Sequence, residues 1–202
     1  MPMWRASKPL LLASKSQVRR KILASAGLPV EARPAPIDER AIEARSNVHD
    51  AREVARVLAG AKAHTVAAEM PARVVLGADQ TLTLGARRFS KPVGRDGARE
   101  QLKALRGATH ELHSALTLVR DGEVLFEYSD TARLTMRAFS DEFIERYLDA
   151  VGDGAYASVG GYQIENVGIH LFERIEGDYF TILGLPLLPL LEYLRQSGMT
   201  TG

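Results

Sequence analysis

Four side chains near the start of the chain could together bind a phosphate group. Ser14 and Ser16 supply hydroxyls, and Arg19 and Arg20 supply guanidinium groups that pair readily with phosphate oxygens. No acidic residue precedes Glu31, so the charged side chains of this segment are all positive. The pattern fits a phosphate cradle, and it also fits a basic helix that simply faces water.

The local pattern predicts where these side chains sit. An apolar run predicts a buried strand over residues 10–13, and a helix is expected to follow with Ser16 as its N-cap. Arg19 and Arg20 then lie in the first turn, where the positive end of the helix dipole disfavours cations by roughly 0.3–1 kcal/mol each. A bound anion would remove that penalty and would also accept from the free backbone N–H groups.

Two carboxylates could add metal or acid–base chemistry to this cradle. Asp79 follows the apolar run of residues 74–76, which places it at the carboxyl end of a sheet strand, where open α/β sheets bind ligands. Glu39 lies in a proline-flanked loop. Taken singly, each has an ordinary structural explanation: Asp79 as the cap of a turn, and Glu39 as a solvated surface residue. Together they could hold a Mg²⁺ ion that also binds phosphate oxygens.

Two lysines are the further candidates for contact with a phosphoryl group. Lys62 lies in a predicted helix and Lys91 precedes a proline, and both are point charges that could neutralise negative charge as it develops. Each is also what an ordinary surface lysine looks like. Only their combination with the serines, arginines and carboxylates favours a functional interpretation.

Length and composition bound the remaining possibilities. The chain has 202 residues, 46% of them hydrophobic, which is enough to bury the core of one domain, with room for two lobes. Its 26 basic and 25 acidic residues give a net charge of +1, which argues against nonspecific nucleic-acid binding. The absence of cysteine excludes disulfides and a cysteine nucleophile. Its apolar runs are too short or too interrupted by proline for a signal peptide or membrane span, so we expect a soluble, cytoplasmic protein.

Hydrophobic periodicity and turn residues predict an α/β fold around a mixed sheet, because helical patterns alternate with hairpins. Asp121-Gly122 is the strongest hairpin signal, and another hairpin is expected at Gly85. Loops are expected at 34–39 and 152–161. The predicted strands are 10–13, 29–33, 73–76, 111–120, 123–137 and 168–175; the predicted helices are 17–26, 51–69, 96–106, 141–150 and 187–197.

Other familiar motifs fail on inspection. The run Gly152-Asp153-Gly154 fits a loose dinucleotide fingerprint, but it follows a predicted helix instead of a strand. His110 and His113 lie three residues apart on a predicted strand and so face opposite sides, which predicts one packed and one exposed histidine instead of a metal site. There is no P-loop, nucleophile elbow or zinc-protease motif.

Several short motifs, in a fixed order from Leu10 to Leu194, resemble the Maf family. Each is brief, but their joint occurrence is specific. They are Leu12-Ala13-Ser14-Lys15-Ser16 with Arg19-Arg20, Asp38-Glu39, Gly77-Ala78-Asp79-Gln80, Lys91-Pro92, Gly161-Tyr162-Gln163-Ile164-Glu165, and Ile175-Glu176-Gly177-Asp178-Tyr179 running to Gly184-Leu185-Pro186.

The resemblance implies a cytoplasmic nucleoside triphosphate pyrophosphatase that cuts between the α and β phosphates with the help of a divalent cation, Mg²⁺ or Mn²⁺. It also implies clearance of noncanonical nucleotides, a homodimer, and an elongated α/β fold with a deep cleft like that of inosine triphosphate pyrophosphatases. We expect one Maf-like domain over residues 10–197, an N-terminal extension over 1–9 and a C-terminal tail over 198–202.

The resemblance also assigns roles to individual residues. Asp79 matches the proton acceptor that activates water, and Glu39 matches the acidic residue that helps to hold the metal. The positions that match phosphate contacts are Ser14, Arg19, Lys62 and Lys91. We expect Ser16 and Arg20 to bind the same phosphates.

Three further positions discriminate between bases in the family, and here they are Val18, Gln80 and Glu165. Gln80 with Glu165 is the pair found in the branch that acts on 7-methyl-GTP, whereas the dTTP and UTP enzymes carry Thr and Gln. A carboxylate only accepts hydrogen bonds, which suits the N–H groups of a guanine edge. The chain departs from the family at Gln17, usually proline, and at Val18, a tryptophan in the 7-methyl-GTP branch; the loss of that aromatic ring removes a stacking surface.

Two competing functions use the same features. A noncatalytic nucleotide-binding regulator of septum formation, a process with which the family was first associated, would bind a triphosphate without turnover. A sugar-nucleotide transferase would release pyrophosphate only when a second substrate is present. Retention of both Glu39 and Asp79 favours hydrolysis, because a pure sensor needs no carboxylate to activate water.

Overall fold

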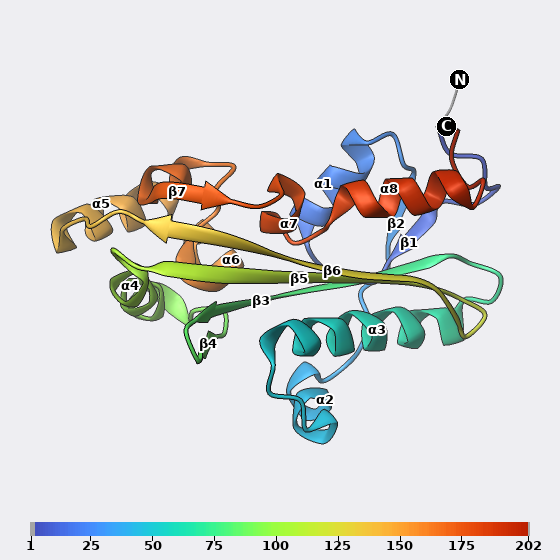
Figure 1. The fold of residues 1–202 in the computed structure, drawn as a ribbon, viewed down its shortest axis with the longest axis horizontal. Helices are drawn as coiled ribbons and strands as arrows, with labels where there is room; N and C mark the ends of the chain where they lie inside the picture. The colour runs from blue at the N-terminus through green and yellow to red at the C-terminus, as the bar shows by residue number, and fades with distance from the viewer. Residues whose placement is uncertain (1–2, 202) are drawn as a thin grey trace. The chain divides into compact units, whose positions relative to one another are not determined.

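The computed structural model describes residues 3–201 and forms a mixed α/β fold around a seven-stranded sheet. The strand order is β2-β1-β3-β5-β6-β7, with β4 paired to β3 (Figure 1). Strand β1 pairs in parallel with β2 and with β3, whereas the pairs β3–β4 and β6–β7 are antiparallel. The predicted α/β class with a mixed sheet is therefore confirmed.

The described residues divide into two compact units. The first contains residues 3–80, 113–130 and 178–201, and the second contains residues 81–112 and 131–177. Three strands contribute residues to both: β3 (Val75–Leu84), β5 (Thr109–Arg120) and β6 (Glu123–Met136). The boundaries expected for a single domain over 10–197 stay a prediction, and residues 1–2 and 202 of the predicted extension and tail lie outside the described residues.

Seven elements belong wholly to the first unit. They are β1 (Leu10–Leu12), α1 (Gln17–Ser25), β2 (Val30–Ala32), α2 (Glu39–Ser46), α3 (Ala51–Glu69), α7 (Tyr179–Ile182) and α8 (Leu187–Gln196). Alternation along the strands sends Leu11 and Val75 against α3, and Leu12 and Leu76 into the core formed with α1 and α8. Each face of the strands in this unit is thus covered by helices.

The second unit is built around α4 and α5. Its elements are β4 (Arg87–Phe89), α4 (Gly94–Leu105), α5 (Asp141–Val151), α6 (Gly154–Ala157), β7 (Phe172–Glu176) and the 3₁₀ turns η1 (Val159–Gly161) and η2 (Val167–Leu171). Glu145 on α5 pairs with Arg95 and Arg99 on α4, with an Nη2–Oε2 distance of 2.7 Å to Arg95. These ion pairs join the two helices.

Several predicted elements are confirmed and others are wrong. Helix 51–69 and the hairpins at Gly85 and Asp121-Gly122 are confirmed. The strand expected over 73–76 is too short, because β3 runs to Leu84 and keeps Asp79 inside it. The strand expected from 168 begins at Phe172, after η2.

Two predicted loops contain helices, and one predicted exposure is wrong. Asp38 caps α2, because its carboxylate accepts the backbone N–H of Ala41 at 3.1 Å, so Glu39 is the first residue of a helix. The loop over 152–161 holds α6 and η1. His110 and His113, expected as one packed and one exposed histidine, are both buried, at 0% and 8% exposed.

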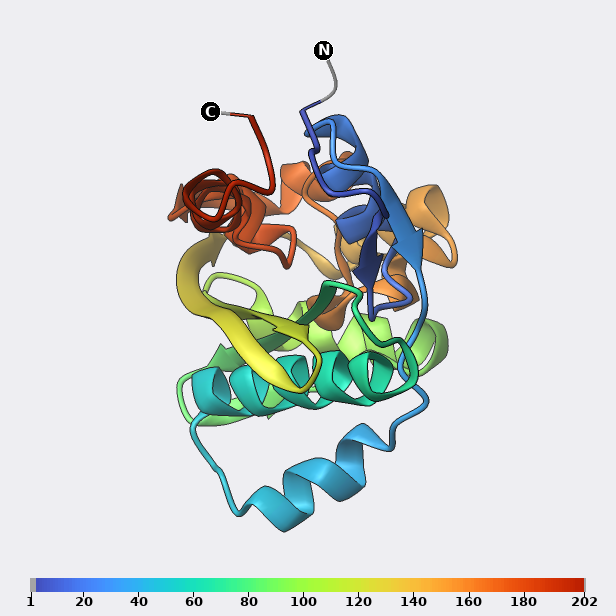
Figure 2. The same ribbon diagram turned by 90° about the vertical axis from the view of Figure 1, so that its right-hand side faces the viewer.

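The chain ends of the first unit lie together. Trp4 is buried and forms an antiparallel bridge with Thr200, and the backbone N–H of Arg5 donates to the carbonyl of Met199 at 2.9 Å. In both orientations α2 lies along the side of α3 that faces away from the strands (Figure 2). No helix within residues 3–201 has the length and apolar composition needed to cross a bilayer.

His110, in the second unit, is buried, and its protonation destabilises the folded protein. Its Nε2 lies 2.6 Å from the hydroxyl of Tyr162, its Nδ1 has no partner among the described residues, and burial lowers its pKa to about 4. The ordinary pKa is 6.5, so the unfolded chain binds this proton first. The free energy of unfolding therefore falls as pH drops from 6.5 towards 4, by about 3 kcal/mol in total.

Urea unfolding of wild type and His110→Gln between pH 7 and 4 measures this effect. We expect His110→Gln to lose stability less steeply than wild type, because glutamine keeps a polar group beside Tyr162 but does not titrate. The exposed His49→Gln is the matched control and keeps the wild-type slope. Identical slopes for wild type and His110→Gln would contradict the assignment.

Candidate active site

A buried lysine is the centre of the candidate site. The Nζ atom of Lys62, on α3, lies 2.5 Å from Oδ1 of Asp79 and 2.7 Å from Oε1 of Glu39. Lys62 and Asp79 are each about 8% exposed, whereas the side chain of Glu39 is half exposed. Three of the predicted site residues, from separate parts of the chain, thus converge on one ammonium group.

A glycine allows this convergence. Gly77 lies two residues before Asp79 on β3, and a Cβ atom at this position would lie 2.0 Å from the carbonyl oxygen of Ala59 and 2.9 Å from Cβ of Ala63. Only glycine permits so close an approach of α3 to the strand. Lys62 precedes Ala63 on the same helix, so the absence of a side chain at residue 77 brings the ammonium within reach of Asp79.

The environment of Asp79 sets its proton affinity. Burial raises the pKa of Asp79 above its ordinary value, and the charges of Lys62 and Arg19 oppose that effect. The positive neighbours favour the carboxylate that a general base must be, while burial makes that carboxylate a stronger base than one in water. A carboxylate so placed can take a proton from a water molecule.

Arg19 is held in place mainly by backbone and hydroxyl oxygens. Its Nε donates to the carbonyl of Gly184 at 2.7 Å, and its Nη1 donates to the carbonyl of Ala78 at 2.9 Å and to Oγ of Ser14 at 3.1 Å. Of the three guanidinium nitrogens of Arg19, only Nη2 makes no hydrogen bond to another residue within 3–201. The guanidinium is therefore fixed, with one nitrogen free to bind a further acceptor.

The serines form the turn between β1 and α1, as predicted. The hydroxyl of Ser14 accepts from the backbone N–H of Ser16 at 3.2 Å, and Ser16 caps α1 by accepting from the N–H of Arg19 at 3.3 Å. The first turn of α1 contains no acidic residue. Arg20 points to the exposed side of α1, so the two arginines lie in different surroundings.

The remaining predicted residues divide between the two units. Val18 is partly buried against the core of the first unit, and Gln80 follows Asp79 on β3. Lys91 and Glu165 are exposed residues of the second unit. The roles of these four residues stay predictions.

Sequence reasoning missed the residues that support Arg19 and Gln80. The carbonyls of Ala78 and Gly184 act through the backbone, which leaves no side-chain signal in a sequence. Ser114 looks like any small residue on an alternating strand, although its Oγ lies 3.0 Å from Nε2 of Gln80. Gly184 was part of a motif, but its φ of +88° could not be read from the sequence.

The carboxylates fit a hard divalent cation that also binds phosphate. Glu39 and Asp79 each place an oxygen against the ammonium of Lys62, so the two carboxylates lie close together, and Mg²⁺ commonly takes one or two carboxylates with substrate oxygens supplying the rest. Within residues 3–201 no group of three or more His, Asp or Glu side chains could enclose a metal alone. The donor set therefore fits a cation shared with a phosphate.

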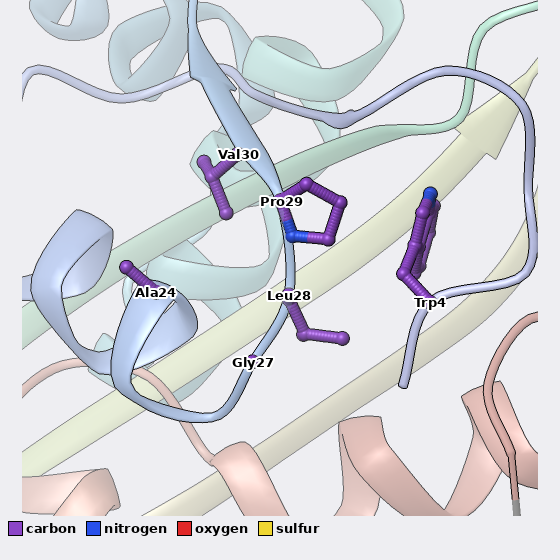
Figure 3. A pocket seen from close by; sticks show the side chains of 6 residues that line it. All are labelled: Trp4, Ala24, Gly27, Leu28, Pro29 and Val30. Carbon is purple, nitrogen blue, oxygen red and sulfur yellow. The ribbon is translucent and has the colours of Figure 1, made fainter. Parts of the chain in front are cut away.

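A separate shallow pocket lies elsewhere on the first unit. Its volume is about 560 Å³, and its walls carry no titratable side chain (Figure 3). It is lined by Trp4, Ala24, Gly27, Leu28, Pro29 and Val30. This apolar surface has none of the chemistry of the Lys62 cluster.

Sequence comparison with known proteins identifies one family. The family model described as Maf-like protein matches residues 9–197. A nucleoside triphosphate pyrophosphatase of Nitrobacter hamburgensis is 56% identical over 199 residues, 98% of each chain. A 7-methyl-GTP pyrophosphatase of Rhizobium etli is 53% identical over 195 residues, 96% of this chain and 98% of the relative. A HAM1 protein of Coxiella burnetii matches in structure with a TM-score of 0.42 and 16% identity, over 63% of this chain and 72% of that one.

Gly184→Ala is expected to destabilise the protein by disturbing Arg19. The new Cβ would require a left-handed alanine and would lie 3.2 Å from Nη2 of a guanidinium that three hydrogen bonds hold in place. We expect the free energy of unfolding to fall by at least about 2 kcal/mol. Gly198→Ala is the matched control, since Gly198 has a φ of +72° and no atom near its added Cβ; it should lose only about 1 kcal/mol. If urea unfolding gives the two variants equal losses in the free energy of unfolding, Arg19 can move away from the added Cβ without destabilising the protein.

Proposed function

The chain belongs to the Maf family, and we propose that it is a nucleoside triphosphate pyrophosphatase. The reaction hydrolyses the bond between the α and β phosphates and yields a nucleoside monophosphate and pyrophosphate. The observation that carries the proposal is the buried ammonium of Lys62 between Asp79 and Glu39, beside a fixed guanidinium. Relatives that align over almost the whole chain carry the same activity in their names.

Each residue has a defined part in the proposed reaction. Asp79 accepts a proton from water as the water oxygen forms a bond to phosphorus and the bridging P–O bond breaks. Lys62 keeps Asp79 ionised at 2.5 Å, and Nη2 of Arg19 contacts a phosphate oxygen. Fixed cations of this kind stabilise the charge that passes to the leaving pyrophosphate.

A divalent cation, Mg²⁺ or Mn²⁺, completes the proposed site, held by Glu39 and Asp79. When bound, it neutralises phosphate charge and polarises the oxygens it touches. From the resemblance, four further residues are proposed to contact the rest of the triphosphate: Ser14, Ser16, Arg20 and Lys91.

For the base, we propose a modified purine, with 7-methyl-GTP as the first candidate. Gln80 and Glu165 are the pair expected for that branch, and a relative of 53% identity is named for the same substrate. dTTP and UTP are the alternative, because Val18 offers no aromatic ring to stack on the base. A cytoplasmic location and a homodimer are part of the same proposal.

Asp79→Asn tests the general base. The amide keeps the size of the side chain but cannot accept the proton, so we expect pyrophosphate release from 7-methyl-GTP to fall roughly 100-fold or more. Release is measured with Mg²⁺ over a panel of triphosphates, and circular dichroism checks folding. Glu31→Gln is the control, since it removes a carboxylate outside the Lys62 cluster. Oε2 of Glu31 pairs with Nη2 of Arg73 at 2.8 Å. Equal rates for wild type and Asp79→Asn would remove Asp79 from the mechanism, and triphosphate binding without any pyrophosphate release would favour the regulator.

Metal dependence has its own test. We expect EDTA to stop pyrophosphate release and either Mg²⁺ or Mn²⁺ to restore it. Glu39→Gln should raise the metal concentration needed for half-maximal rate roughly tenfold, because one of two carboxylate ligands is lost. Full activity of wild type after EDTA and dialysis would contradict a metal-dependent reaction.

A further inference from the structure

A sharp turn at the end of α7 holds the guanidinium of Arg19. The N–H of Gly184 donates to the carbonyl of Thr181 at 3.0 Å, and the N–H of Leu185 donates to the carbonyl of Phe180 at 3.0 Å. Gly184 is left-handed, with a φ of +88°, so these two bonds make a Schellman turn. The carbonyl of Gly184 accepts from Nε of Arg19 at 2.7 Å. The position of the turn therefore determines where Arg19 is held.

The turn contains one carbonyl that the backbone cannot satisfy. In a continuing helix the carbonyl of Ile182 would accept from residue 186, but residue 186 is a proline and has no N–H. Ile182 is buried, so an unpaired carbonyl at this position would destabilise the turn. A side-chain donor is needed here.

The side-chain amide of Gln80 supplies that donor. Its Nε2 lies 3.0 Å from the carbonyl oxygen of Ile182 and 3.2 Å from that of Thr181. Backbone carbonyls only accept hydrogen bonds, so the NH₂ group of the amide faces them, with one N–H for each carbonyl. Gln80 belongs to a strand of ten residues, whereas α7 is a single turn of four. A lone turn is not stable by itself, so the strand supports the turn.

The other side chains that bond to α7 reach only its Thr181. Asp178 caps the helix by accepting from the N–H of Thr181 at 2.9 Å, and Ser114 donates to the carbonyl of Thr181 at 2.7 Å. Among the described side chains, Gln80 is the one that bonds to the backbone of residues 182–183. The last part of the turn, which leads to the carbonyl that holds Arg19, thus depends on Gln80.

Gln80 and Arg19 lie against the same glycine. A Cβ atom added to Gly184 would be 3.6 Å from Cδ of Gln80 and 3.2 Å from Nη2 of Arg19. The bonds from Nη1 of Arg19, to Ala78 and Ser14, do not involve this turn. They hold one nitrogen, and the bond at Nε is the second point that fixes the plane of the guanidinium and with it the direction of Nη2.

We propose that Gln80 is a positioning residue: its amide holds the turn after α7 and, through the carbonyl of Gly184, fixes the direction in which Nη2 of Arg19 meets a phosphate oxygen. The proposal rests on the proposed function, because it takes Nη2 as the phosphate contact. It gives Gln80 itself no contact with phosphate.

Proton exchange at Nε of Arg19 tests the positioning without any ligand. In wild type this N–H is bonded to the carbonyl of Gly184, so nuclear magnetic resonance should show slow exchange with water. Methionine is nearly as long as glutamine and has no N–H, so in Gln80→Met we expect exchange to be roughly tenfold faster or more. The spectrum of Arg19→Lys, which lacks this N–H, identifies the signal.

Binding of inorganic tripolyphosphate, a probe with neither base nor sugar, tests the effect on phosphate. In calorimetry with Mg²⁺, Gln80→Met should bind it roughly tenfold more weakly than wild type. In the Arg19→Lys background the same substitution should cause no further loss of affinity, because Gln80 acts through Arg19. Gln196→Met is the matched control: it removes an amide that bonds to Glu192 at 2.8 Å, and it should keep wild-type exchange and affinity.

Several outcomes overturn the proposal. Unchanged exchange at Nε of Arg19 in Gln80→Met contradicts it, and so does an unchanged affinity for tripolyphosphate or a loss that adds fully to that of Arg19→Lys. If Gln80→Met does not fold, Gln80→Asn takes its place, because its amide is one methylene shorter and cannot reach both carbonyls. If wild type releases no pyrophosphate from any triphosphate, the proposed function fails, while exchange at Nε still decides the role of Gln80.

Discussion

The structure of the candidate site depends on one buried ammonium between two carboxylates. Asp79 is too buried to hold a charge alone, and Lys62 at 2.5 Å supplies the opposite charge that makes its ionised form tolerable. Lys62 reaches it only because Gly77 lets α3 lie against β3 with no side chain between them. The absence of a Cβ at residue 77 thus permits the close packing of α3, this packing lets Lys62 pair with Asp79, and the pairing keeps Asp79 ionised, as the proposed base requires.

The opposite face of the same strand carries the second half of the site. Because successive residues of a strand point to opposite faces, Asp79 faces α3 while Gln80 faces the carboxyl end of α7. The pairing of β1 with β3 ends at Leu76 of β3. Two residues further along β3, the carbonyl of Ala78 accepts a hydrogen bond from Nη1 of Arg19. The guanidinium thus serves as the hydrogen-bond donor to β3 beyond the end of β1. This arrangement explains why Arg19 is buried and why it depends on Gly184.

The sequence predicted what side-chain patterns encode. Apolar runs located β1 and α3, Asp121-Gly122 located a hairpin, and Ser16 was correctly identified as a helix cap. The resemblance named Asp79, Glu39 and Lys62 for one site, and the structure brings these three together. Helix α2 was missed because prolines before Asp38 read as a loop. The carbonyls that hold Arg19 and Gln80 could not be predicted, because backbone acceptors are the same in every residue and only the folded chain determines where they point.

The two carboxylates on Lys62 differ in a way that divides their roles. Asp79 comes from the interior of a strand and is nearly enclosed, so its position is fixed and water reaches it poorly, as suits a base that acts on one water molecule. Glu39 begins a short helix that has no buried residue, and its side chain is half exposed. A carboxylate in that position can exchange its ammonium partner for another cation at little desolvation cost. Environment, and not residue type, therefore gives Asp79 the additional role of proposed base, although both carboxylates are proposed metal ligands and touch the same nitrogen.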